Sequence, residues 1–134
     1  FAVTTGHGLK ELTWEFEKDN DDYSSIMSKI IADRLVEAFS EKMHEMIRKD
    51  LWAYSKDESF SINDLIKERY QGLRPAPGYP AGPDHQHKDY IWQMLDVERN
   101  TGITLTETRS MFPAASLSGW YFSNPKSKYF MISK

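Results

Sequence analysis

The sequence RPAPGYPAGP, residues 74–83, decides how this chain is interpreted. Each of its four prolines fixes φ near about −65° and lacks a backbone N–H group to donate. The residue before each proline is driven toward extended geometry. Gly78 is the point at which this segment can turn sharply or let a ligand approach the backbone. We therefore expect a stiff, irregular loop, which is either a plain connection between two helices or a binding segment.

The residues before this loop predict helices. Leu9–Lys18 has apolar residues at helical spacing, and Asp21 or Asp22 can cap a long helix over Ser24–Lys49. Apolar residues recur every three or four positions in the long helix and predict one stripe that faces the core. The members of this stripe are Met27, Ile30, Ile31, Leu35, Ala38, Phe39, Met43, Met46 and Ile47.

Two further helices are expected on either side of the proline-rich segment. Ser61, with Asp64 three residues later, is a weak variant of the capping box and opens a helix that Gly72 can terminate. After the prolines, apolar residues at helical spacing predict one helix over Lys88–Thr101, and Gly102 stops it.

The two ends of the chain favour strands. Phe1–Thr5 is short, apolar and β-branched, and residues 103–106 alternate between apolar side chains and threonine. Ser116–Phe122 and Lys128–Ile132 are rich in aromatic residues and read as two strands joined by a turn. Helices followed by an antiparallel hairpin indicate an α+β fold, with helices packed on a mainly antiparallel sheet.

Composition narrows the class of protein. The chain has 134 residues, enough for one domain, and its formal net charge is −3 with 17 basic and 20 acidic residues. This balance argues against a nucleic-acid partner, which needs a basic excess. The sequence has no cysteine, and no run approaches the roughly 18 apolar residues that a membrane span requires. We expect a protein that lies in the cytoplasm and has no membrane partner.

A short polar stretch after the prolines offers a weak metal motif. His85 and His87 flank one residue and follow Asp84, but two ligands on a helix are expected about four residues apart, and a third ligand is not obvious. The preferred interpretation is a polar helix N-terminus and no metal site. A small acid–base enzyme built on these three side chains is a distant alternative. For His44, in the middle of the long helix, we assign no role.

Several blocks of sequence together resemble one family. DDYSSIMSKIIADRLVEAF (residues 21–39), RPAPGYP (74–80), PAASLSGWYFSNPKSKYF (113–130) and the opening FAVT are similar, in the same order, to the activation domain of cobalamin-dependent methionine synthase. The resemblance covers essentially the whole chain. Because the family's domain is longer at both ends, it implies that residues 1–134 are part of a single activation domain, truncated at both ends.

The resemblance implies a function in reactivating an oxidised cofactor. The family's activation domain binds S-adenosylmethionine beside the cobalt of cobalamin, and an electron from flavodoxin or a flavoprotein reductase allows reductive remethylation of cob(II)alamin to methylcobalamin. The expected partners are therefore that electron donor and the enzyme's own cobalamin-binding domain, which holds the cobalamin. The enzyme as a whole is a methyltransferase, whereas this chain by itself is expected only to bind the ligand.

The resemblance also assigns the site. Arg74 offers a planar donor fork that suits the ligand's carboxylate. Glu37 suits the ammonium group, although a plain surface carboxylate is the alternative. The exposed backbone at Ala76 and Gly78 can bind the adenine edge without a specific side chain.

Aromatic residues complete the predicted site. Tyr79 could stand between the ligand and the corrin ring, and Tyr129 and Phe130 match the family's second ligand-contacting segment. The Phe130 side chain could equally belong to the core of the sheet. Since the reduced cobalt is the nucleophile, the reaction needs a good alignment of methyl donor and cobalt but no protein base, and we assign no catalytic residue.

One alternative function stays open. A non-catalytic docking module could keep this fold and use the same surface for a flavodoxin or a cobalamin-domain partner. Such a module would bind its partner without any response to S-adenosylmethionine.

Overall fold

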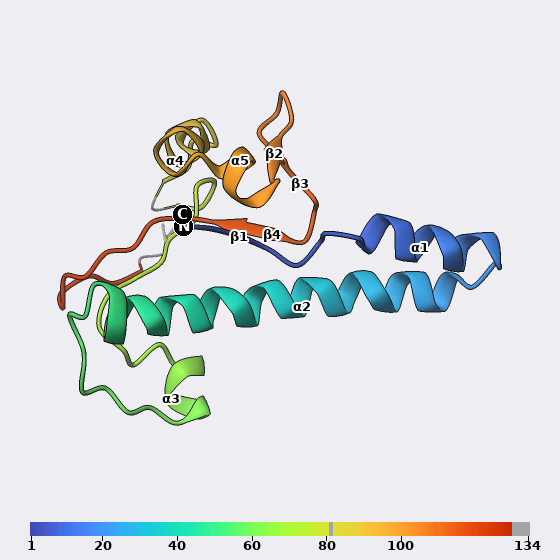
Figure 1. The fold of residues 1–134 in the computed structure, drawn as a ribbon. Coiled ribbons are helices and arrows are strands. Elements are labelled where there is room, and N and C mark those ends of the chain that lie inside the picture. Colours follow the sequence, from blue (N-terminus) through green and yellow to red (C-terminus); the bar gives the residue numbers. More distant parts are fainter. Residues whose placement is uncertain (81, 130–134) are drawn as a thin grey trace, which may run out of the picture.

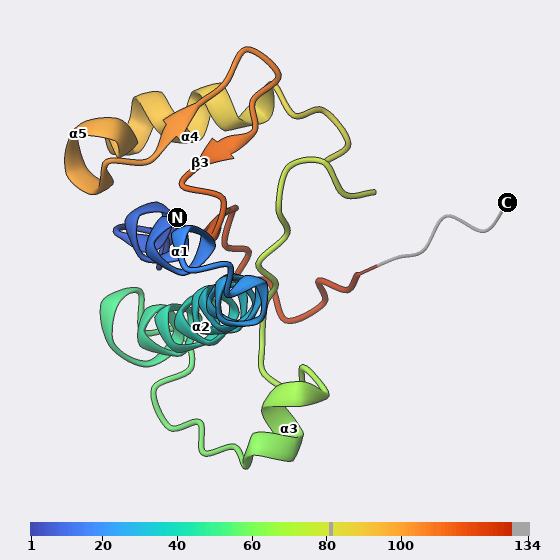
Figure 2. The ribbon, with the colours of Figure 1, turned by 90° about the vertical axis from the view of Figure 1, so that its right-hand side faces the viewer.

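A computed structural model describes residues 1–80 and 82–129 of the chain. A long helix, α2 (Asp22–Met46), runs through the molecule between two groups of elements (Figure 1). A small sheet with helices α4 and α5 lies on one side of α2, and helix α3 lies on the other, as the view turned by 90° also shows (Figure 2). None of the helices in the described ranges is both long enough and apolar enough to cross a bilayer.

The helices begin close to where their capping residues predict. Asp21 caps α2, because its side chain accepts a hydrogen bond from the Ser24 backbone N–H group at 2.9 Å, and Ser61 and Asp64 form a complete capping box. The helix predicted to run from Ser61 to Gly72 is shorter in the structure, where it ends at Ile66. The other helices are α1 (Leu9–Lys18), the π-helical turn η1 (Ile47–Leu51), α3 (Ile62–Ile66), α4 (His87–Leu95) and α5 (Val97–Thr101).

The prediction of one continuous helix over Lys88–Thr101 is wrong, because Asp96 divides this segment into α4 and α5. Asp96 has left-handed backbone angles, φ 47° and ψ 50°, which a short polar residue tolerates better than most. The Asn100 side chain donates to the Leu95 carbonyl at 2.8 Å and satisfies one acceptor that the break leaves without a helical partner.

The strands pair differently from the predicted hairpin. Strand β1 (Ala2–Thr4) pairs antiparallel with β4 (Ser116–Ser118), and a second pair joins β2 (Thr104–Leu105) to β3 (Met111–Phe112). The predicted strand over Ser116–Phe122 is therefore shorter, and its partner is the start of the chain. Lys128 and Tyr129 lie outside any strand, and the rest of the second predicted strand lies outside the described residues.

Beyond β4, the chain turns to the proline-rich loop for its next hydrogen bonds. The Trp120 N–H group donates to the Pro75 carbonyl at 3.0 Å, and Leu73 and Phe122 form an isolated antiparallel bridge. The start of the loop is thus attached to the segment that follows β4, which fixes the position of Arg74.

The buried face of α2 is not the apolar stripe that the sequence predicts. Its buried residues are Ser25, Ala32, Val36, Ser40 and His44, and Arg48 continues this line into η1. Most members of the predicted stripe are exposed, Ile30, Ile31 and Leu35 among them. The buried line faces β1 and β4, where the Thr5 hydroxyl group donates to the Ala32 carbonyl at 2.7 Å, and small side chains permit this close approach. The prediction of which face packs was therefore wrong.

A compact apolar cluster lies beneath α4 and α5. Ile91, Val97 and Ile103 are fully buried, and Trp92 packs against them while its indole N–H group donates to the Ile103 carbonyl at 2.9 Å. This cluster links the two short helices to β1 through Ala2 and to β3 through Met111.

Truncating this cluster should be costly. Ile103 is 0% exposed, so Ile103→Ala removes buried methyl groups and should lower the free energy of unfolding by about 2–5 kcal/mol in urea denaturation. Ile62 on α3 is 77% exposed, and Ile62→Ala should change the same quantity by less than about 0.5 kcal/mol. Equal losses in the two variants would contradict the assignment of the core.

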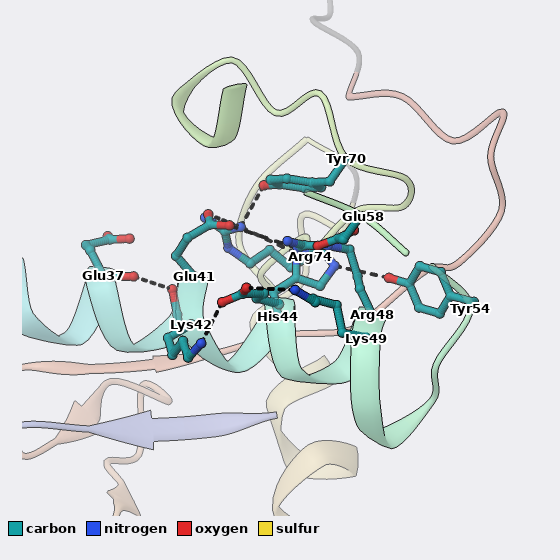
Figure 3. Close-up of polar contacts among 12 residues, drawn as sticks. Glu37, Glu41, Lys42, His44, Arg48, Lys49, Tyr54, Glu58, Tyr70 and Arg74 are labelled. Atoms are coloured by element: carbon teal, nitrogen blue, oxygen red, sulfur yellow. Dashed lines mark hydrogen bonds and ion pairs between the residues drawn. The ribbon is translucent and has the colours of Figure 1, made fainter. Parts of the chain in front are cut away.

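The end of α2 carries a buried polar cluster, made of Glu41, His44, Arg48, Glu58, Tyr70 and Arg74 (Figure 3). Arg48 is fully buried, and its Nε atom donates to both carboxylate oxygens of Glu58 at 2.8 and 2.9 Å. The guanidinium of Arg48 lies over the ring of Tyr70, 4.0 Å from its centroid. Two guanidinium groups thus face two carboxylates in this cluster.

His44 is fully buried among these groups and stacks on Tyr121 with ring centroids 5.1 Å apart. Burial, followed by the positive charges of Arg48 and Arg74, lowers the pKa of His44 to about 3. The imidazole is therefore neutral near pH 7, and its Nε2 atom lies 3.3 Å from the Tyr54 hydroxyl oxygen.

This histidine should make the fold sensitive to mild acid. Below the ordinary histidine pKa of 6.5, the unfolded chain binds a proton at His44 that the folded chain does not, so the free energy of unfolding should fall as the pH drops from 7 to 5. We expect up to about 1 kcal/mol per pH unit after allowance for solvent screening. His44→Phe keeps a ring beside Tyr121 and should flatten this dependence in pH-resolved urea denaturation. A slope that the substitution leaves unchanged would assign the effect to other groups.

Candidate functional site

The proline-rich loop closes on itself next to Gly78. The Gly78 N–H group donates to the Gly82 carbonyl and the Gly82 N–H group donates to the Tyr79 carbonyl, both at 2.8 Å. Gly78 has a φ of 100°, and the ring of His85 lies where a Cβ atom would project. Glycine is needed here for the turn and for the contact with His85.

Beside this turn, a pocket of about 250 Å³ opens between α2, the start of the proline-rich loop and β4. Phe1 and Tyr129 also line it, so segments from both ends and the middle of the chain meet at one place. The pocket is lined by Phe1, Glu37, Ser40, Arg74, Pro75, Ala76, Tyr79, Pro80, Leu117, Ser118 and Tyr129. We refer to it as the Arg74 pocket.

The structure brings five of the seven predicted site residues into this pocket: Glu37, Arg74, Ala76, Tyr79 and Tyr129. Gly78 is the exception within the described ranges, since it does not line the pocket and instead supports the turn beside it. Phe130 lies outside the described residues. Tyr79 as a residue is 66% exposed and therefore lies at the surface of the pocket.

Three side chains that do not line the pocket contact the guanidinium of Arg74. Its Nη1 atom lies 2.7 Å from Glu41 Oε2, donates to the Tyr70 hydroxyl oxygen at 2.7 Å, and lies 3.5 Å from His44 Nδ1 (Figure 3). Burial alone would lower the pKa of Arg74, but Tyr70 and Glu41 raise it above its ordinary value. Arg74 is thus a fixed positive charge at the pocket wall.

Opposite charges share the pocket. Glu37 precedes Glu41 by one helical turn on α2, and its carboxylate lines the space that Arg74 also faces. Tyr129 adds a further link, because its hydroxyl oxygen accepts the Arg74 backbone N–H group at 3.1 Å. A cation and an anion that line the same pocket can bind the two charged groups of an amino-acid moiety.

Sequence reasoning missed the residues behind Arg74. Glu41 follows Glu37 by four positions, and Tyr70 precedes Arg74 by four, yet neither spacing distinguishes these residues from ordinary surface side chains. His44 received no role, and it is in fact buried between two arginines. Only the meeting of α2 with the segment after α3 shows what these side chains do.

The weak metal motif forms no cluster. Within residues 1–80 and 82–129, no group of three or more histidine and acidic side chains is placed to hold a metal ion. His85 instead packs on Gly78, and His87 is the first residue of α4, which matches the interpretation as a helix N-terminus.

Comparison with known proteins agrees with the fold. The family "Vitamin B12 dependent methionine synthase, activation domain" matches residues 1–134. A solved structure described as "Crystal Structure of the MetH Reactivation Domain bound to AdoHcy" is 54% identical with a TM-score of 0.94, over 96% of this chain and 40% of that chain. The predicted α+β fold and the family resemblance are both confirmed. The chain therefore belongs to the family of the vitamin B12-dependent methionine synthase activation domain.

Proposed function

We propose that this chain binds S-adenosylmethionine and supports the reductive remethylation of cob(II)alamin to methylcobalamin within a cobalamin-dependent methionine synthase. The observation that carries the proposal is that Arg74 and Glu37, a cation and an anion, both line one pocket. The similar structure at 54% identity, described as bound to AdoHcy, supports the same class of ligand.

Three parts of the ligand, the carboxylate, the ammonium group and the adenine, have a matching group in this chain. The carboxylate binds to the Arg74 guanidinium, and the ammonium group binds to the Glu37 carboxylate. The backbone near Ala76, in the extended part of the loop, offers polar groups to the adenine edge, and Gly78 shapes that segment. Tyr129 lies beside Arg74, because its hydroxyl oxygen accepts a hydrogen bond from the Arg74 backbone N–H group.

In the proposed remethylation, the role of this chain is to orient the methyl donor. Cobalamin, held by the enzyme's cobalamin-binding domain, supplies the reduced cobalt that accepts the methyl group. The Arg74 pocket would hold the amino-acid end of the ligand, so that the sulfonium methyl group projects from the pocket mouth in a fixed direction. The exposed ring of Tyr79 lies at that mouth, where a cobalamin-binding domain would approach.

The partners are part of this proposal. The cobalamin-binding domain and an electron donor, either flavodoxin or a flavoprotein reductase, would meet the face that carries the proline-rich loop. Because this chain spans 40% of the similar solved chain, the methyltransferase activity of a longer enzyme is proposed from the family. The docking-module alternative assigns the same face to the same partners without a ligand.

Replacement of Arg74 tests the proposed ligand site. Arg74→Ala should weaken S-adenosylmethionine binding at least about 10-fold in a calorimetric titration, because charge-assisted hydrogen bonds to the carboxylate are lost. Arg69→Ala is the matched control: Arg69 lies close in sequence, is largely exposed and pairs with Asp64, so its loss should leave the affinity unchanged.

Two other outcomes would revise the proposal. An Arg74→Ala variant with unchanged affinity would remove Arg74 from the site. A wild-type chain that binds a cobalamin domain or flavodoxin but gives no heat with S-adenosylmethionine would favour the docking module.

A further inference from the structure

We propose that Glu41 and Tyr70 are positioning residues for Arg74. They hold one end of its guanidinium so that the remaining donors face the carboxylate of the ligand. This inference rests on the proposed function, because it assumes that Arg74 binds that carboxylate. It extends the site to two residues that do not line the pocket.

The contacts of the Arg74 guanidinium are concentrated on its Nη1 atom. A guanidinium carries five N–H donors, two of them on Nη1. Nη1 forms an ion pair with Glu41 Oε2 at 2.7 Å, donates to the Tyr70 hydroxyl oxygen at 2.7 Å, and lies 3.5 Å from His44 Nδ1, so its contacts are made within the protein. In the described part of the chain, every hydrogen bond or ion pair of this guanidinium runs through Nη1. The Nε and Nη2 donors therefore form the edge that a bidentate carboxylate would use.

The two acceptors come from different segments and are themselves held in place. Glu41 lies on α2, and Tyr70 lies after α3 with only 6% of its surface exposed. Arg48 covers the Tyr70 ring at 4.0 Å, and its Nη1 atom lies 4.0 Å from Glu41 Oε1. Glu58 in turn holds Arg48 through two hydrogen bonds. The buried Arg48–Glu58 pair therefore supports the Tyr70 ring directly and Glu41 through a longer contact.

Glu41 has two opposite effects on the affinity of the site for a carboxylate. Its negative charge partly neutralises Arg74 and would by itself weaken the attraction for a carboxylate. Its ion pair with Nη1 restricts the rotamers of the long Arg74 side chain, which would otherwise lose that freedom on binding. Arg48 Nη1 lies 4.0 Å from Glu41 Oε1 and offsets part of that charge, although Glu58 is the direct partner of Arg48. We therefore expect the positioning effect to dominate.

The test compares two ligands on three variants, in calorimetric titrations or equilibrium dialysis. Glu41→Ala should weaken S-adenosylmethionine binding about 10-fold, and Tyr70→Phe, which keeps the ring under Arg48, about 5-fold. Glu41→Gln retains an acceptor and should recover most of the affinity. Decarboxylated S-adenosylmethionine has no carboxylate for Arg74, so its weaker affinity should be the same in wild type and variants.

Glu45→Ala provides a matched control. Glu45 lies one turn after Glu41 on α2, and its side chain is exposed to a similar extent, 31% against 26%. It pairs only with Lys42 and Lys49 among the described residues, at 2.7 and 3.7 Å. Its replacement should leave the affinity for both ligands unchanged.

Several results would overturn the proposal. Unchanged or tighter S-adenosylmethionine binding by Glu41→Ala would mean that Glu41 only competes for Arg74. Equal losses for both ligands, or a similar loss in Glu45→Ala, would indicate a general structural effect. If Glu41→Ala does not fold, Tyr70→Phe decides alone, and full affinity in that variant overturns the inference. A wild-type chain that binds neither ligand, or an Arg74→Ala variant with full affinity, would instead contradict the proposed function.

Discussion

The ion pair between Arg48 and Glu58 is buried at the end of α2, and the arrangement around the pocket depends on it. Both side chains are almost fully removed from solvent, so each needs the other: loss of one partner leaves an uncompensated charge that typically costs about 3–5 kcal/mol. The pair connects α2 to the loop that follows it, and Arg48 also supports the ring of Tyr70. The segment between α3 and the proline-rich loop is thereby fixed against α2.

The Arg74 pocket follows from this arrangement. Arg74 enters it from a segment whose backbone pairs with residues after β4, and its guanidinium meets Glu41 on α2. Glu37, one turn earlier on the same helix, faces the pocket. One helix therefore supplies both the carboxylate behind Arg74 and the carboxylate available to a ligand, and helical spacing keeps their separation constant.

Much of the fold was predictable from local signals, but not the face on which its main helix packs. Caps at Asp21 and Ser61 depend on neighbouring residues, so the sequence alone predicted where α2 and α3 begin. The face of α2 depends on its partner. β1 and β4 approach along Ala32, Val36 and Ser40, whose small size allows close contact, whereas periodicity favoured the larger apolar side chains. Asp96 divided a predicted helix because its left-handed geometry carries no clear sequence signal.

The sequence by itself determined the family, the α+β class and five of the eleven pocket-lining residues, because motifs such as RPAPGYP are contiguous and specific. Only the tertiary structure decided what stands behind Arg74. Glu41, His44 and Tyr70 are ordinary residues in their own segments, and they gain a role when α2 meets the chain after α3. The physical reason is that burial and short-range hydrogen bonds act between neighbours in space, and the neighbours of a side chain are set by packing rather than by sequence order.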